Sequence, residues 1–184
     1  MKIKPWETLS NVTLIEAPIF SVGKYARRHP DKNTEADFWW VSPPDWVNIL
    51  AITPEDGIVL VRQYRHGTDE ITLEIPGGAV DPGESMPEAA ARELREETGY
   101  TCAYWEQIGQ IDVNPAFMTN RCTTFLGVNA TLTDDTDFDE HEELSVEIYP
   151  VEYFFDMIDK GEIDHGIVVS AAYFLQRWRA RNRK

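Results

Sequence analysis

The segment Gly77–Tyr100 limits the fold and chemistry of this chain more than any other stretch of its sequence. Residues 81–83 are Asp-Pro-Gly, a combination typical of a tight turn. Ser85 is followed three residues later by Glu88, which is the spacing of an N-cap and its capping box. Gly99 is typical of the residue just past a helix end. The segment therefore predicts a loop that leads into a short helix.

The predicted helix gathers its carboxylates on one side. Glu93, Glu96 and Glu97 have the i, i+3, i+4 spacing of neighbours on a helix surface. Adjacent carboxylates repel one another, and a bound divalent cation removes that penalty because Mg²⁺ and Mn²⁺ prefer oxygen ligands. Arg92 lies one turn before Glu96 and can orient it. The alternative is that these glutamates form a solvated acidic face without a metal. The opposite side of the helix is predicted to be an apolar stripe of Pro87, Ala90, Leu94 and Thr98.

The spacing of the whole segment resembles the Nudix box. The matching positions are Gly78, Glu84, Arg92, Glu93, Leu94, Glu96, Glu97 and Gly99, whereas Tyr100 stands where an aliphatic residue is usual. Because so many fixed positions agree, the chain is identified as a member of the Nudix hydrolases. The resemblance implies hydrolysis of a nucleoside diphosphate linked to another group.

The resemblance also implies roles for residues of the box. Mg²⁺, with Mn²⁺ as the alternative, is expected to be held by the Gly77 carbonyl and by Glu93, Glu96 and Glu97. Glu96 is further expected to act in catalysis together with Arg92. The expected fold is α/β, a Nudix α/β/α sandwich with a mixed β-sheet, formed by residues 45–184. Residues 1–44 are expected to form a small β-rich segment through which the protein dimerises, since relatives exchange strands there.

The order of the predicted elements agrees with such a sandwich. Alternating or continuous apolar runs predict strands, and the later helical patterns predict one helix ended by Gly161 and a last helix capped by Asp164. Residues 27–33 are polar and predict a loop. The predicted strands cover residues 12–15, 19–22, 46–52, 58–65, 71–76, 101–113, 121–128 and 144–149, and the later helices begin at 151 and after 164. Residues 38–41 are an apolar and aromatic run that ends at the two prolines at 43 and 44.

Two stretches before the box resemble the ADP-ribose pyrophosphatase branch of the family. They are Val-Arg-Gln-Tyr-Arg at residues 61–65 and Leu-Glu-Ile-Pro-Gly-Gly at residues 73–78. The branch implies that an arginine here contacts the substrate phosphates, with Arg65 as the first candidate, Arg62 as the second and Glu74 beside them. Ala116 departs from the branch, which usually has glycine there. The alternatives are a GDP-mannose or other nucleotide-sugar hydrolase, a MutT-like nucleoside triphosphate pyrophosphohydrolase, and a non-catalytic regulator that binds ADP-ribose.

The stretch from Asp134 to Glu143 is acidic and contains no lysine or arginine. By itself this composition predicts a solvated loop. The resemblance implies that such a loop brings a general base and one more metal ligand to the box. Glu140 matches the position of the base and Glu142 that of the ligand, with Glu143 as the alternative for either.

The net charge excludes some classes of partner. Against 32 acidic residues stand 17 lysines and arginines, so the formal net charge is −15, which repels nucleic acids and anionic membranes. Binding of a phosphate substrate then requires metal ions and local arginines that reverse the negative electrostatic field of the protein, which favours a metal site.

No apolar run resembles a signal peptide or a membrane span, which predicts a cytoplasmic protein. Cys102 and Cys122 predict buried, reduced thiols, and Trp6 is a candidate for stacking on a purine.

Overall fold

The structure, a computed structural model, describes residues 2–138 and 143–182. The chain divides into two compact units. The first contains the residues up to Pro44 together with Asp112–Arg121, and the second contains Asp45–Ile111 and the chain from Cys122 onward. The two units are described separately.

The first unit is built on a three-stranded antiparallel sheet. Its strands are β1 (Glu7–Glu16), β2 (Ser21–Arg28) and β3 (Glu35–Ser42), in the order β1-β2-β3. Strand β2 includes residues 27 and 28, so the prediction of a loop from residue 27 was wrong at its start, where pairing with β1 and β3 overrides the polar sequence. Trp40 donates a hydrogen bond to Asn11 across the sheet, with a nitrogen–oxygen distance of 2.9 Å.

The second unit contains a mixed sheet, as the sequence predicts. Strand β4 pairs in parallel with β9, whereas β5 pairs antiparallel with β6 and with β10. The order is β10-β5-β4-β9-β8, with β6 attached to β5 and β7 attached to β4. The strands are β4 (Trp46–Ile52), β5 (Gly57–Arg65), β6 (Glu70–Glu74), β7 (Gly77–Ala79), β8 (Tyr100–Asp112), β9 (Arg121–Leu132) and β10 (Leu144–Pro150).

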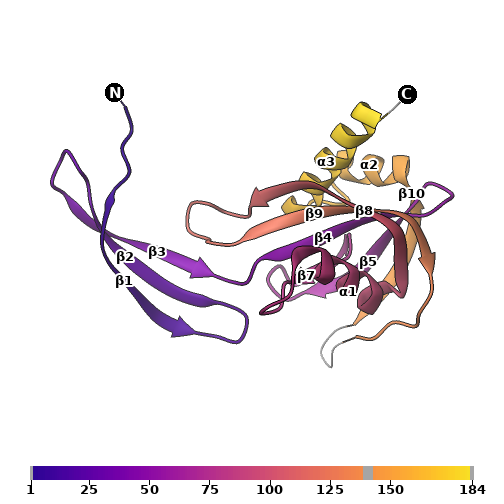
Figure 1. Ribbon diagram of the computed structural model, residues 1–184, viewed down its shortest axis with the longest axis horizontal. Helices are drawn as coiled ribbons and strands as arrows, with labels where there is room; N and C mark the ends of the chain where they lie inside the picture. The colour runs from indigo at the N-terminus through magenta and orange to yellow at the C-terminus, as the bar shows by residue number, and fades with distance from the viewer. Residues whose placement is uncertain (1, 139–142, 183–184) are drawn as a thin grey trace. The chain divides into compact units, whose positions relative to one another are not determined.

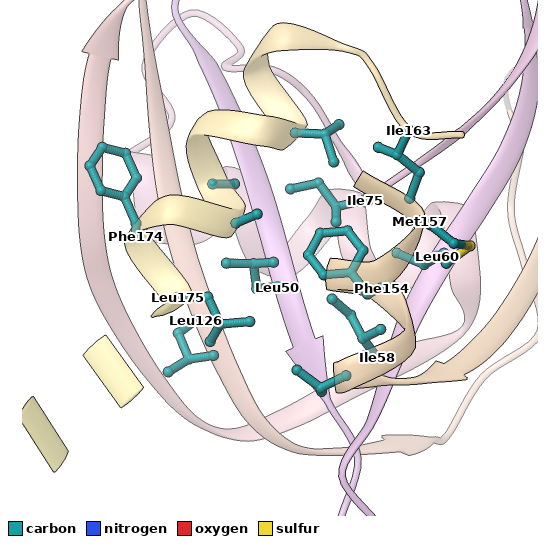
Figure 2. Packing of buried hydrophobic residues seen from close by; sticks show 14 of the residues in the cluster. Leu50, Ile58, Leu60, Ile75, Leu126, Phe154, Met157, Ile163, Phe174 and Leu175 are labelled. Atoms are coloured by element: carbon teal, nitrogen blue, oxygen red, sulfur yellow. The ribbon is translucent and has the colours of Figure 1, made fainter. Parts of the chain in front are cut away.

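Helices cover both faces of this sheet and complete the predicted sandwich. Helix α1 (Met86–Thr98) lies on one face, and α2 (Val151–Asp159) and α3 (Gly166–Asn182) lie on the other (Figure 1). Two apolar clusters follow from the alternation of strand side chains. Val59 of β5 packs with α1 residues such as Leu94, whereas Leu60 packs with Phe154 and other residues of α2 and α3 (Figure 2).

Within helix α1 both predicted boundaries are confirmed. Ser85 is the N-cap, and its backbone N–H donates to the Glu88 carboxylate at 2.9 Å. Gly99 ends the helix in the left-handed conformation, with φ of 72°. The predicted faces of the helix were wrong for two residues: Glu97 is buried with the apolar stripe and is only 4% exposed, whereas Pro87, predicted in that stripe, is exposed in the first turn.

Two further differences concern local boundaries. Residues 77–79, predicted as loop, pair with the start of β4 as the short strand β7. Helix α3 begins at Gly166, one residue later than a cap at Asp164 predicts, and its first hydrogen bond runs from the N–H of Val169 to the carbonyl of His165. In the described part of the chain, no helix is both long and apolar enough to cross a membrane.

The segment that follows β9 forms backbone hydrogen bonds with the C-terminal end of α1. The backbone N–H groups of Thr133 and Asp134 donate to the carbonyl of Gly99 at 3.0 and 3.1 Å, and Asp137 donates to the carbonyl of Glu96 at 2.9 Å. A Cβ on Gly99 would lie closer than 3.0 Å to the carbonyl oxygen of Asp134. Glycine is therefore required here both for its positive φ and for this close approach.

This packing predicts that Gly99→Ala destabilises the protein more than Gly161→Ala. Both glycines are left-handed, with φ of 72° and 73°, but a Cβ on Gly161 meets no described atom within 4 Å. Gly161→Ala should lower the free energy of unfolding by about 1–2 kcal/mol, which is the cost of the left-handed backbone conformation for a residue with a Cβ. Gly99→Ala should cost about 1–3 kcal/mol more, because the loop must move. Urea denaturation measures both, and equal losses would contradict the close approach.

Candidate active site

Helix α1 places its acidic residues against the backbone of β7. Glu97 is buried, and its Oε2 accepts a hydrogen bond from the backbone N–H of Gly77 at 2.9 Å. A buried carboxylate requires such donors because its desolvation is costly. Gly77 must be glycine, since a Cβ there would lie closer than 3.0 Å to the carbonyl oxygen of Val47 in β4. The predicted ligands Gly77 and Glu97 are therefore adjacent.

Glu93 approaches the same strand one residue further on. A Cβ on Gly78 would lie 2.5 Å from Oε1 of Glu93, so the carboxylate occupies the space that a side chain at residue 78 would need. Two consecutive glycines thus allow two carboxylates, separated by one helical turn, to reach the backbone of β7. This arrangement explains the Gly-Gly pair at the start of the box.

Arg92 connects the remaining acidic residues of the box. Its Nε and Nη2 donate to the two carboxylate oxygens of Glu84, each at 2.9 Å, and its Nη2 also donates to the carbonyl of Ala79 at 3.1 Å. Its Nη1 contacts Glu93 at 2.9 Å and Glu96 at 3.1 Å. The hydrogen bonds to Glu84 raise the pKa of Arg92, and those from Arg92 lower the pKa of Glu84. Arg92 is therefore placed to orient Glu93 and Glu96, as the sequence predicts for Glu96.

The donors of this site suit a hard divalent cation. Three carboxylates lie within two turns of one helix, those of Glu93 and Glu97 beside the backbone of β7, and oxygen donors are those that Mg²⁺ and Mn²⁺ prefer. Within residues 2–138 and 143–182, however, no three His, Cys, Asp or Glu side chains converge in a geometry that could hold a metal ion. The guanidinium of Arg92 lies between Glu93 and Glu96 and balances their charge.

Arg65 and Glu74 form an ion pair on the side of the sheet that α1 covers. Arg65 Nε and Nη2 donate to the two oxygens of Glu74 at 2.7 and 2.8 Å. Glu74 pairs in register with Val61, and Arg65 lies four residues after Val61, so both share the face of Val59 and α1. Glu74 is buried, whereas the Arg65 side chain is 43% exposed.

Arg62 lies on the opposite face. It pairs in register with Leu73, which belongs to the apolar cluster beneath α2 and α3. Its guanidinium contacts Glu147 at 2.5 and 3.2 Å, and Tyr149 donates to the same carboxylate at 2.5 Å. The structure therefore separates the two candidate arginines and brings only Arg65 to the face that carries the box.

The other predicted residues lie outside the described residues, just before β10 or in the first unit. Glu140 and Glu142 fall in residues 139–142, outside the described part, and Glu143 is exposed just before β10. Trp6 belongs to the first unit, where its ring packs edge-on against His29 and Phe38 at centroid distances of 5.0 and 5.1 Å.

Sequence reasoning missed two residues that contact Glu74. Thr72 donates its hydroxyl to Oε1 at 2.6 Å, and His165 donates from Nδ1 to Oε2 at 2.7 Å. Residues 72 and 74 are two apart in a strand, so their side chains point to the same face of the sheet, and the sequence could have indicated this contact. His165 is 91 residues distant, and no local pattern indicates the contact.

Comparisons with known proteins agree with this architecture. The model of the NUDIX domain matches residues 42–171. The chain is 31% identical over 137 residues to an ADP-ribose pyrophosphatase of Bacillus subtilis, covering 74% of each protein. It is 28% identical over 173 residues to an ADP-ribose pyrophosphatase of Mycobacterium tuberculosis, covering 90% of this chain and 80% of the relative. A crystal structure of an ADP compounds hydrolase has the same fold, with a TM-score of 0.87, 22% identity and complete coverage of both chains.

The buried ion pair predicts a stability that depends on pH. Burial raises the pKa of Glu74, but the hydrogen bonds from Arg65, His165 and Thr72 outweigh it, so the pKa lies well below its ordinary value near 4.5. The folded state thus favours the carboxylate, and this stabilisation is present above pH 4.5 and is lost as the pH falls below it. At pH 7, Glu74→Gln should lower the free energy of unfolding by roughly 1–3 kcal/mol.

Urea denaturation at pH 7, 5 and 3.5 tests this dependence. The difference between the natural protein and Glu74→Gln should shrink at the lowest pH. Glu152→Gln is the control, because Glu152 is exposed and its pair with Arg179 should contribute little at any pH. A difference for Glu74→Gln that grows on acidification would contradict the prediction.

Proposed function

The chain belongs to the Nudix family, and from this premise we propose that it is a Mg²⁺-dependent enzyme that hydrolyses the pyrophosphate bond of ADP-ribose. The products are AMP and ribose 5-phosphate. The observation that carries the proposal is the position of Arg65 and Glu74 on the same face of the sheet as the glutamates of α1. A cationic side chain and the proposed metal ligands thus belong to one face, which is what cleavage of an anionic diphosphate requires.

The carboxylates of α1 supply the negative half of this site. Glu93, Glu96 and Glu97, with the Gly77 carbonyl, would hold Mg²⁺, with Mn²⁺ as the alternative. When bound, the metal neutralises the phosphate oxygens and lowers the pKa of the attacking water. Arg92 keeps Glu93 and Glu96 oriented through its contacts with both. Its bidentate pair with Glu84 fixes the guanidinium itself, so the orientation does not depend on flexible contacts alone.

Arg65 is proposed to contact the diphosphate, and the face that it shares with α1 favours it over Arg62. Trp6 is retained as a candidate for stacking on the adenine. If Trp6 takes this role, Trp6→Leu should lower the affinity for ADP-ribose without lowering that for ribose 5-phosphate, as calorimetry can measure.

Glu140 is proposed as the general base and Glu142 as a further metal ligand, with Glu143 as the alternative. Support comes from the described start of the acidic loop. The hydrogen bonds from Thr133 and Asp134 to Gly99, and from Asp137 to Glu96, attach this part of the loop to the end of α1. The last of these contacts attaches Asp137, three residues before Glu140 in the sequence, to the helix that is proposed to hold the metal.

Other substrates are consistent with the same box. A GDP-mannose hydrolase or a MutT-like enzyme would use the same helix and differ in the pocket for the base. A non-catalytic regulator would bind ADP-ribose without turnover. The box glutamates are all present, which favours an enzyme.

A screen with product identification separates these alternatives. ADP-ribose, GDP-mannose, UDP-glucose, NADH, diadenosine polyphosphates and 8-oxo-dGTP are each incubated with enzyme and Mg²⁺. We expect the highest kcat/KM for ADP-ribose, with AMP and ribose 5-phosphate as products. Release of pyrophosphate from 8-oxo-dGTP at a higher kcat/KM would favour the MutT-like function. Binding of ADP-ribose without turnover of any substrate would favour the regulator.

Two glutamine variants should separate metal binding from proton transfer. Glu97→Gln should weaken Mg²⁺ activation by about 10–100-fold, because a buried ligand is lost. Glu140→Gln should lower kcat by about 10²–10⁴-fold with Mg²⁺ activation unchanged, because the base is lost. Mg²⁺ titrations of the initial rate measure both, with Glu152→Gln as the control. Full activity of Glu97→Gln would refute its role as a ligand, and an unchanged kcat in Glu140→Gln would move the base to Glu142 or Glu143.

The first unit is proposed to form a homodimer with a second copy. Its sheet has only three strands and leaves many large apolar side chains exposed. Apolar surface of this kind marks a site of protein–protein contact, and contact with a partner would stabilise so small a sheet. Val12, Lys24 and Trp39 pair in register and share one face, and Trp39 is 59% exposed. The large exposed apolar residues of this unit are Ile3, Leu9, Val12, Leu14, Ile15, Ile19, Phe20, Phe38, Trp39 and Phe117.

Light scattering coupled to size-exclusion chromatography tests the dimer. The natural protein should have twice the mass of one chain, and the double variant Val12→Glu/Trp39→Glu should have the mass of one. Tyr104→Glu is the control, because Tyr104 is equally a large exposed side chain but lies in the second unit. A natural protein with the mass of a single chain would refute the proposal.

A further inference from the structure

Glu74, the last residue of β6, is held by donors from β5, from its own strand and from the residue before α3. Its Oε1 accepts from Arg65 Nε in β5 and from Thr72 in β6, at 2.7 and 2.6 Å. Its Oε2 accepts from Arg65 Nη2 and from His165 Nδ1, at 2.8 and 2.7 Å. Each carboxylate oxygen thus has two donors, one from Arg65 and one from another residue. The plane of the carboxylate is fixed independently of the arginine.

The burial of the two partners differs. The side chain of Glu74 is 3% exposed, and that of Arg65 is 43% exposed. Glu74 is therefore inaccessible to a nucleotide, whereas Arg65 can meet one. A planar carboxylate that accepts both Nε and Nη2 of an arginine restricts the orientation of the guanidinium. The accessible cation is thus oriented by a buried group.

His165 is in a position to decide the orientation of that buried group. It immediately precedes α3, and its carbonyl accepts the first hydrogen bond of that helix, so its backbone is fixed. The lowered pKa of Glu74 keeps the carboxylate ionised, and an ionised carboxylate only accepts hydrogen bonds. Nδ1 of His165 must therefore carry the proton that it shares with Oε2. Because His165 is a half-exposed side chain, this contact is not explained by burial of the ring.

We propose that His165 is a positioning residue that, by its hydrogen bond to Glu74, fixes the guanidinium of Arg65 for the substrate diphosphate. The proposal deepens the proposed function and rests on the role given there to Arg65. Without His165, Oε2 keeps only the donor from Arg65, so the carboxylate and the guanidinium can turn together. The ground-state and transition-state contacts of Arg65 with the diphosphate are then weakened alike, which raises KM and leaves kcat nearly unchanged.

Steady-state kinetics with ADP-ribose and Mg²⁺ test this role. His165→Leu removes the donor and should raise KM about tenfold, with kcat changed less than about twofold. His165→Asn keeps an N–H donor at the position of Nδ1 and should stay within about twofold of the natural KM. His66→Leu is the matched control, because His66 is exposed and follows Arg65 directly in the sequence. Its KM should be unchanged.

A double-mutant cycle with Arg65→Ala distinguishes the possible failures. If His165 acts through Arg65, His165→Leu should have no further effect on KM in the Arg65→Ala background. If Arg65→Ala leaves KM unchanged, the proposed role of Arg65 fails. If Arg65→Ala raises KM and His165→Leu does not, the present inference fails while the proposed function stands.

Thermal unfolding of the same variants identifies a merely structural role. Such a role would lower the melting temperature of His165→Leu and His165→Asn without changing KM in either, and it would overturn the proposal. If His165→Leu does not fold, His165→Gln provides the second variant. Its longer side chain places the amide donor elsewhere, and a natural KM for His165→Gln would likewise overturn the proposal.

Discussion

The burial of carboxylate charge against the sheet is the constraint on which the second unit depends. Glu97 and Glu74 are almost completely buried, and each must be supplied with hydrogen-bond donors from another element. For Glu97 a donor is the backbone of β7, which requires the helix to lie close to the strand. For Glu74 the donors from other parts of the chain are Arg65 in β5 and His165 just before α3, and Thr72 of its own strand adds a third. The consecutive glycines at 77 and 78, the capped ends of α1 and the short strand β7 all serve this close approach.

The cationic residues divide into two groups with different tasks. Arg92 contacts three glutamates of the box and is itself held by a bidentate pair, so it organises charge within the helix and its preceding loop. Arg65 is oriented by one buried carboxylate and keeps an accessible side chain. In a chain with a formal net charge of −15, these fixed cations offset local repulsion that would otherwise oppose an anionic ligand. The acidic composition and the phosphate chemistry are therefore compatible.

Local signals in the sequence were sufficient for α1, whereas the mixed sheet was implied by the resemblance to the Nudix family. Ser85, Glu88 and Gly99 determine the ends of the helix through contacts within a few residues, and these contacts are readable from spacing. Burial of Glu97 was not readable, because it depends on how closely β7 approaches the helix. The contact of His165 with Glu74 joins residues far apart in the chain, and no periodicity encodes it. Long-range polar contacts are thus the part of the site that a single sequence does not specify.

The alternation of β5 has a consequence for how related proteins can diverge. Arg62 and Arg65 differ by an odd number of positions, so they point to opposite faces, and only one of them shares the face of α1. A substitution in this strand alters one contact, whereas insertion or deletion of one residue would exchange the faces of every side chain beyond it. Related proteins should therefore differ in this strand by substitutions at constant length, and insertions or deletions should be confined to the turns on either side.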